Sequence, residues 1–277
     1  MSTASVSSSW ITAQTRPAAS RRRRWEISGS SGTRASSHDQ GRVSCAEPVM
    51  TVETEIGTVR VRVRRVLPGA ACQGGAMWSG IERDALVRAL LATDPQTPTL
   101  CEGWQARHLA AHLYLRRHRP WAMGQLSSVA ERAADPAAYL DVVAEFAAPV
   151  PARSPLALLD RSDAANLAEY VIHHEDLRRG EAAGAGAVAR EFPAEMTAAV
   201  LAQLRVFSMR MLRGCPVGVV LATPAGISRV VRTGPAPVTI RGTAADLALA
   251  LAGRLRAAHV RWVGPPRAIE ALRHQLH

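Results

Sequence analysis

The sequence contains no lysine, so all 34 of its basic residues are arginine, and aromatic residues make up only 4% of its 277 residues. Its four cysteines, at positions 45, 72, 101 and 215, form no C-x-x-C pair. This spacing supports neither a zinc ribbon nor a disulfide framework and is typical of a reducing cytoplasm. P-loop, G-x-S-x-G and dinucleotide-binding motifs are also missing.

No apolar run approaches the length of a transmembrane helix, and the N-terminus lacks the apolar core of a secretory signal. We therefore expect a cytoplasmic protein without a membrane partner. The net charge of +11 is uneven, because residues 1–76 carry 11 arginines against 5 acidic residues. A nucleic-acid partner would have to bind this first segment, where four arginines occupy 21–24. A solvated tail is the simpler interpretation of that run, so nucleic-acid binding is not expected.

Residues 1–76 do not resemble a folded domain. The first 45 residues are rich in serine and arginine, which predicts disorder. Residues 51–66 alternate apolar and charged side chains, as a strand or hairpin does. Met77 opens an ordinary amphipathic helix, so we expect translation to begin near it and residues 1–76 to be a disordered or non-native extension. N-terminal analysis of protein from the native host tests this expectation.

The rest of the chain predicts a mainly α fold, with a helical domain over 77–214 and a small α/β domain over 215–277. Apolar periodicity predicts five helices, at 80–93, 105–118, 136–147, 162–179 and 193–213. Four such helices can bury one another in a bundle, where metal sites arise from facing side chains. Beyond Gly214 the pattern changes to short strands separated by turns, with a helix capped by Thr243 between the later ones.

Glu169 and His173 form the most informative pair in the sequence. Four residues apart on a helix, a carboxylate and an imidazole project from the same face. His112, on another helix, could complete three protein ligands and leave a fourth position open, as catalytic metal sites do. Asp176, one turn beyond His173, could orient its imidazole. His174 lies about 100° around the helix and should point elsewhere.

Simpler explanations compete with a metal site at this point. Glu169 and His173 could form a solvated surface pair, and His112 could be a satisfied core histidine. His108, one turn before His112, competes with it for the ligand role. Cys101 could act as a nucleophile only beside a base, which the sequence does not reveal.

Three motifs together resemble a known family. They are T-P-T-L-C-E-G-W-Q-A-R-H-L-A-A-H-L, then E-Y-V-I-H-H-E-D-L-R-R, then P-V-T-I-R-G-T-A-A-D-L-A-L-A-L-A-G-R. In this order they resemble actinobacterial proteins related to mycothiol-dependent maleylpyruvate isomerase, and most closely an uncharacterised metal-binding subfamily. The resemblance covers about 78–277 and implies a DinB-like four-helix bundle followed by a small α/β C-terminal domain.

The resemblance implies that His112, Glu169 and His173 bind a divalent metal, most often zinc, although Fe(II) and Ni(II) suit the same donors. It also implies a catalytic role for Arg254, which would hold an anionic group of the substrate or of the cofactor mycothiol. Where the family usually has H-x-W-D, this chain has H-H-E-D, so Glu175 would make the pocket wall more acidic and maleylpyruvate is not assured as the substrate.

Two functions follow from the resemblance. The first is a thiol-dependent isomerisation or S-transfer on a small electrophile, in which the metal holds the mycothiol sulfur as a thiolate. The second is a non-catalytic, DinB-like metal-binding protein of stress or metal handling. Consumption of an electrophile that depends on both thiol and Glu169 would distinguish the first function from the second.

Overall fold

The computed structural model describes four stretches of the chain, residues 49–56, 59–66, 78–181 and 190–277. Two compact units can be distinguished, Met1–Cys72 and Gln73–His277. In the first unit, β1 (Val49–Ile56) and β2 (Val59–Val66) pair as an antiparallel hairpin. The alternation of apolar and charged residues predicts this hairpin.

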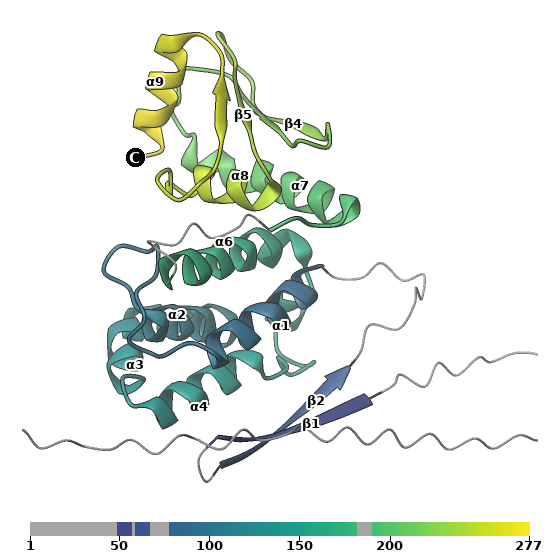
Figure 1. Ribbon diagram of the computed structural model, residues 1–277, viewed down its shortest axis with the longest axis vertical. Coiled ribbons are helices and arrows are strands. Elements are labelled where there is room, and N and C mark those ends of the chain that lie inside the picture. Colours follow the sequence, from purple (N-terminus) through teal and green to yellow (C-terminus); the bar gives the residue numbers. More distant parts are fainter. Residues whose placement is uncertain (1–48, 57–58, 67–77, 182–189) are drawn as a thin grey trace, which may run out of the picture. The chain divides into compact units, whose positions relative to one another are not determined.

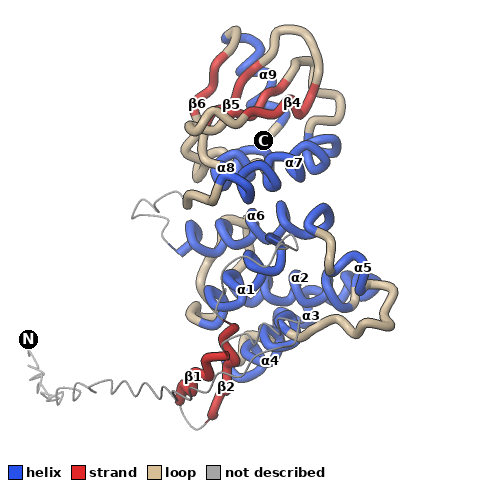
Figure 2. Tube along the Cα trace, turned by 90° about the vertical axis from the view of Figure 1, so that its right-hand side faces the viewer, coloured by secondary structure: helices blue, strands red, loops and turns tan. Residues whose placement is uncertain are grey.

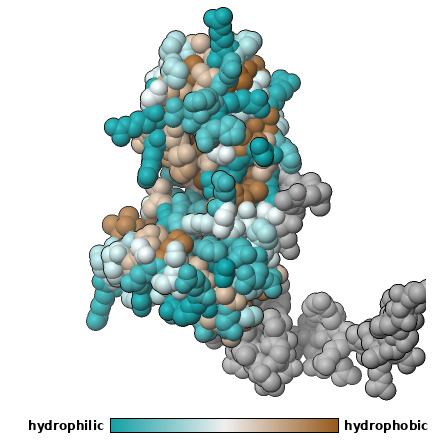
Figure 3. Space-filling model, turned by 90° about the vertical axis from the view of Figure 1, so that its left-hand side faces the viewer, coloured by the Kyte–Doolittle hydropathy of each residue, from teal (hydrophilic) through white to brown (hydrophobic). Residues whose placement is uncertain are grey.

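The disorder predicted for residues 1–45 and the helix start predicted at Met77 both fall outside the described residues. Within those residues, no helix is both long and apolar enough to cross a membrane. On the face drawn in Figure 3, hydrophobic side chains form separate patches in a mainly hydrophilic surface. Scattered exposed apolar side chains of this kind are normal on protein surfaces.

Four helices make up the bundle of the second unit. They are α1 (Trp78–Leu91), α2 (Ala106–His118), α4 (Pro136–Ala147) and α6 (Asp163–Glu181). Helix α1 packs on α6 and α4, and α2 packs on α4 (Figure 1). The predicted positions of all four helices are confirmed to within a few residues. Asp163 fixes the relative positions of α1 and α6, because its carboxylate accepts hydrogen bonds from the backbone of Trp78 and Ser79.

Short helices fill the connections, as the tube in Figure 2 shows for α3 and α5. They are the 3-10 helix η1 (Pro120–Gln125), α3 (Leu126–Arg132) and α5 (Ala157–Asp160). The sequence predicts the end of α2 at residue 118, before Pro120, but none of these short elements. Each is too short to show a clear apolar period.

The C-terminal part begins with α7 (Ala194–Met211) and continues into a four-stranded sheet. Its strands are β3 (Val219–Ala222), β4 (Ser228–Arg232), β5 (Val238–Arg241) and β6 (Arg261–Val263), in the order β4-β3-β5-β6. Strands β3 and β5 run parallel, and the other neighbours are antiparallel. Helix α8 (Ala244–Leu251) follows β5, and α9 (Pro266–Gln275) ends the fold. Thr243 caps α8 as predicted, since its Oγ1 accepts a hydrogen bond from the Asp246 N–H.

Helix α6 contributes to the two largest hydrophobic cores of the described residues. Its residues Tyr170 and Leu177 pack in the core of the bundle, with α1, α2 and α4. Leu167 and Val171 belong to a second core formed with α7, α8, α9 and the sheet. The fold class predicted from the sequence, a helical bundle followed by a small α/β part, is confirmed. Because α7 shares its core with the sheet, the domain boundary placed after residue 214 stays a prediction.

Candidate metal centre

Helices α2 and α6 bring three possible metal ligands together. The Nε2 atom of His112 lies 3.0 Å from Oε1 of Glu169, and Nε2 of His173 lies 3.3 Å from the same oxygen. The two imidazole rings meet edge to face, with centroids 4.9 Å apart. One donor atom from each residue falls within 4.8 Å of the others. The i, i+4 spacing on α6 thus produces the shared face that the sequence predicts.

The cluster is only partly shielded from solvent. The side chains of His112, Glu169 and His173 are 18%, 23% and 11% exposed. Trp104, just before α2, packs its ring 5.5 Å from that of His112. The three side chains are therefore not sealed from solvent.

Two imidazole N–H donors and an arginine surround the Glu169 carboxylate. Burial favours its neutral form, but hydrogen bonds from His112 and His173 outweigh burial and hold its pKa well below the usual range. The Arg116 guanidinium adds a charge 3.2 Å from Oε1. Glu169 is therefore ionised at neutral pH and ready to accept a cation.

Asp176 orients His173 from behind, as its position one turn along the helix predicts. Its Oδ2 lies 2.9 Å from Nδ1 of His173, and the carboxylate is fully buried. Burial opposes ionisation of Asp176, but the hydrogen bond with His173 and the charge of Arg254 keep its pKa low. With Nδ1 engaged in this way, the Nε2 atom of His173 is directed at Glu169.

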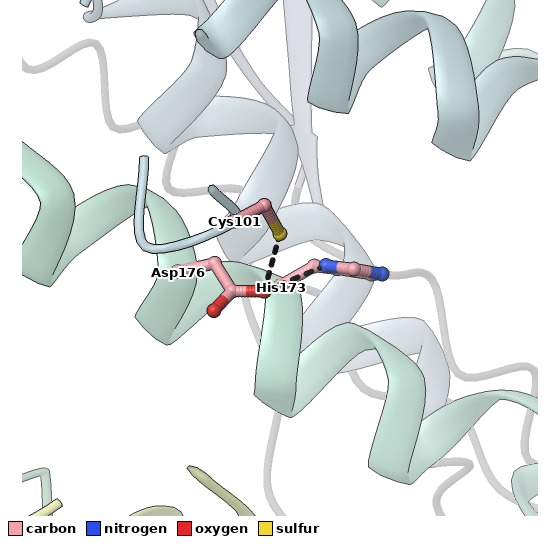
Figure 4. Close-up of side chains that lie close together, drawn as sticks. All are labelled: Cys101, His173 and Asp176. Atoms are coloured by element: carbon pink, nitrogen blue, oxygen red, sulfur yellow. Dashed lines mark hydrogen bonds and ion pairs between the residues drawn. The ribbon is translucent and has the colours of Figure 1, made fainter. Parts of the chain in front are cut away.

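Arg254, which follows α8, contacts Asp176 behind His173 and not the three clustered donors. Its Nε lies 3.0 Å from Oδ1 of Asp176, and its Nη2 contacts Oδ2 of Asp176 and Sγ of Cys101, each at 3.1 Å. Figure 4 shows Cys101, Asp176 and His173 side by side. Cys101, His173 and Asp176 also have ligand atoms within 4.8 Å of one another, but the Arg254 cation in contact with two of them opposes a metal ion there.

The other histidines of the motifs are engaged elsewhere. His108 accepts a hydrogen bond from the backbone N–H of Gln105 at the start of α2, which leaves His112 as the histidine that faces Glu169. His174 points away from the cluster, as its offset predicts, and its Nδ1 lies 2.8 Å from Oε1 of Glu82.

Glu175 does not have the surroundings expected of a pocket wall. Its carboxylate is fully buried and pairs with Arg178, Arg179 and Arg190. The charge that replaces the family's aromatic residue is thus neutralised inside the protein.

Sequence reasoning misses Arg116 as a neighbour of the cluster. Its position four residues after His112 is the available signal, because residues i and i+4 share a helix face. The contacts of Cys101 with Asp176 and Arg254 carry no such signal, since the residues lie 75 and 153 positions away along the chain.

The helical part of the chain is similar to a known protein family. Residues 80–211, which include His112, Glu169 and His173, match the profile of the mycothiol maleylpyruvate isomerase N-terminal domain. The crystal structure of the mycothiol-dependent maleylpyruvate isomerase is similar at 20% identity, with a TM-score of 0.43, over 67% of this chain and 90% of that one. No curated protein matches the sequence. Residues 80–211, a little under half of the chain, are therefore similar to the mycothiol maleylpyruvate isomerase N-terminal domain.

Proposed function

We propose that this protein binds a divalent metal through His112, Glu169 and His173, in an open site and not in a closed structural one. The observation that carries the proposal is the convergence of two Nε2 atoms on one ionised carboxylate that solvent can still reach. Two imidazoles and one carboxylate with an open position suit zinc, and they also suit Fe(II) and Ni(II). Zinc is the metal we favour, in keeping with the resemblance of the motifs.

We further propose that the open position takes a low-molecular-weight thiol, with mycothiol favoured by the family. A divalent metal at this site would supply Lewis-acid stabilisation of the thiolate at neutral pH. The product class is an isomer or an S-adduct of a small electrophile. Maleylpyruvate, the substrate named for the related isomerase, is the first electrophile to test.

The surrounding residues would have separate roles in this reaction. Asp176 would fix the orientation of His173, and Arg116 would limit the negative charge of Glu169. Arg254 would act mainly by positioning Asp176, because its Nε and Nη2 are already directed at that carboxylate. A substrate anion would have to compete with Asp176 for this guanidinium, or use the remaining N–H of Nη1.

The same engagement of Arg254 favours a second candidate function. If Arg254 stays bonded to Asp176, Cys101 and the Ala252 carbonyl, it has little capacity to hold a substrate. The protein would then hold metal without turnover.

An activity assay separates the two candidates. Metal-loaded protein is mixed with mycothiol and either maleylpyruvate or 1-chloro-2,4-dinitrobenzene, which report isomerisation and S-transfer. The enzyme proposal predicts thiol-dependent turnover that Glu169→Ala abolishes and that the exposed-residue control Glu102→Ala retains. Metal binding by the parent with no turnover of either electrophile would favour the second candidate, a protein that binds metal without catalysis.

A further inference from the structure

A groove between α7 and β4 lies outside the candidate metal centre. The two elements pack against each other, as both Figure 1 and Figure 2 show. One wall consists of Arg205, Ser208, Met209 and Leu212, which follow the i, i+3, i+4, i+7 pattern of a single helix face. The other wall is formed by residues 229–232 of the edge strand β4 and by Thr233, which follows it. The groove has a volume of about 730 Å³, within the usual range for small-molecule sites.

A β-bulge shapes the strand wall. Val219 pairs with Arg232 and Val220 with Val230, so Val231 is the extra residue. Val231 is buried in the core, and its carbonyl oxygen lies 3.4 Å from Oγ of Ser208 on α7. This contact joins the two walls. Met209 on the α7 wall is 67% exposed and Val230 on the β4 wall is 50% exposed, which gives the groove an apolar surface.

Three arginines line the groove without a counter-charge. Within the described part of the chain, the side chains of Arg205, Arg229 and Arg232 make no ion pair or hydrogen bond. The Nε atom of Arg232 is buried and has no partner among the described residues. Between Glu195 and Asp246 the sequence has six arginines and no acidic residue, so the local chain offers no carboxylate to neutralise them.

We propose that this groove binds a small organic anion. Carboxylate or phosphate oxygens would pair with Arg205, Arg229 and Arg232, because guanidinium groups bind both through paired N–H bonds. The apolar part of the ligand would cover Met209 and Val230. A metal ion is excluded as the occupant, since the groove offers three cations and no anionic ligand.

Calorimetry on the full chain tests the proposal with phenyl phosphate, phthalate and inorganic phosphate as probes. At least one organic dianion should bind saturably, and about tenfold or more tighter than inorganic phosphate, because it also covers apolar surface. Arg229→Gln and Arg232→Gln should each weaken that binding by about tenfold. Arg267→Gln, which removes the same charge from an exposed position on α9, should leave it unchanged.

Two further variants locate the site and keep the test independent of the proposed function. Met209→Ser should reduce the preference for the organic anion over inorganic phosphate. His112→Ala, which alters the candidate metal centre, should change neither the affinity for the organic anion nor its preference over inorganic phosphate. If Arg232→Gln fails to fold, the exposed Arg229 provides the decisive variant. Absence of saturable binding by both organic dianions, or equal weakening by Arg229→Gln and Arg267→Gln, would overturn the proposal.

Discussion

At the scale of single residues, the candidate metal centre depends on a buried carboxylate behind one of its histidines. Asp176 is fully buried and bonds both His173 and Arg254. In known metal sites such a partner fixes the tautomer and the orientation of the ligand imidazole. The three clustered donors therefore account for only part of the site.

We predict that Asp176→Asn weakens metal affinity by about 10–100-fold while the helical content is retained. Asparagine has nearly the same shape, but it cannot supply the charge that orients His173. Competition with a chelator of known affinity measures the effect, with the exposed Glu102→Gln as the control. Equal affinity of Asp176→Asn and the parent would remove the orienting role.

A second buried pair should make the free energy of unfolding depend on pH in the acid range. Arg117 is 3% exposed and binds both carboxylate oxygens of Asp160, at 2.6 and 3.1 Å. Burial opposes ionisation of Asp160, but the bonds from Arg117 prevail and lower its pKa. Stability from this pair is therefore complete above the unfolded pKa of about 3.9 and is lost as the pH falls toward the folded value.

Asp160→Asn should accordingly cost about 1–3 kcal/mol at pH 7, because Arg117 loses its charged partner. Urea unfolding at a series of pH values should show the gap between parent and variant closing below about pH 4. A gap that stays constant down to pH 3 would contradict this assignment.

At the scale of elements, α6 runs past the end predicted for it. The sequence predicts a helix over 162–179, yet α6 continues through Gly180 to Glu181. A Cβ at Gly180 would lie 2.5 Å from the carbonyl oxygen of Pro98 and closer still to the backbone of Thr99. This glycine allows the loop before α2, which carries Cys101, to pack directly on α6.

Gly180→Ala should therefore displace that loop and destabilise the protein by about 1–3 kcal/mol through overpacking. The matched control is Gly124→Ala, since a Cβ there meets nothing within 4 Å. Thermal unfolding of both variants measures the difference. Equal melting temperatures for the two variants would show that the loop moves freely.

At the scale of the whole molecule, α6 links two cores. Leu167 lies in the core shared with the sheet and Leu177 in that of the bundle, and both side chains are fully buried. Truncation of either should cost about 2–5 kcal/mol. Because one helix carries both residues, residues 73–277 should unfold in a single transition. Leu167→Ala and Leu177→Ala should each lower the midpoint temperature of that transition.

Hydrogen exchange and circular dichroism on each variant check this coupling, with the 80% exposed Leu158→Ala as the control. Two separate transitions, with only the altered core affected, would contradict it.

The sequence predicts the long helices well because runs of 12 to 19 helical residues give a longer pattern than the short elements do. It also brings His112, Glu169 and His173 together, although spacing alone supplies only the pair on α6, and the third ligand depends on the resemblance. The contacts of Asp176 with Arg254 and Cys101 could not be predicted, because they join parts of the chain 75 or more residues apart. The i, i+3 and i, i+4 spacing could have predicted the pairing of Glu175 with Arg178 and Arg179, but neither the contact with Arg190 nor the full burial of the carboxylate shows in that spacing.

The central claim is that His112, Glu169 and His173 hold a metal ion. Its most direct test is metal content by elemental mass spectrometry, on the parent and on His112→Ala, His173→Ala and His108→Ala. We predict about one ion per chain in the parent and in His108→Ala, and loss of the ion in the other two. A parent that takes up no metal after reconstitution, or a His112→Ala variant that keeps it, would contradict the account.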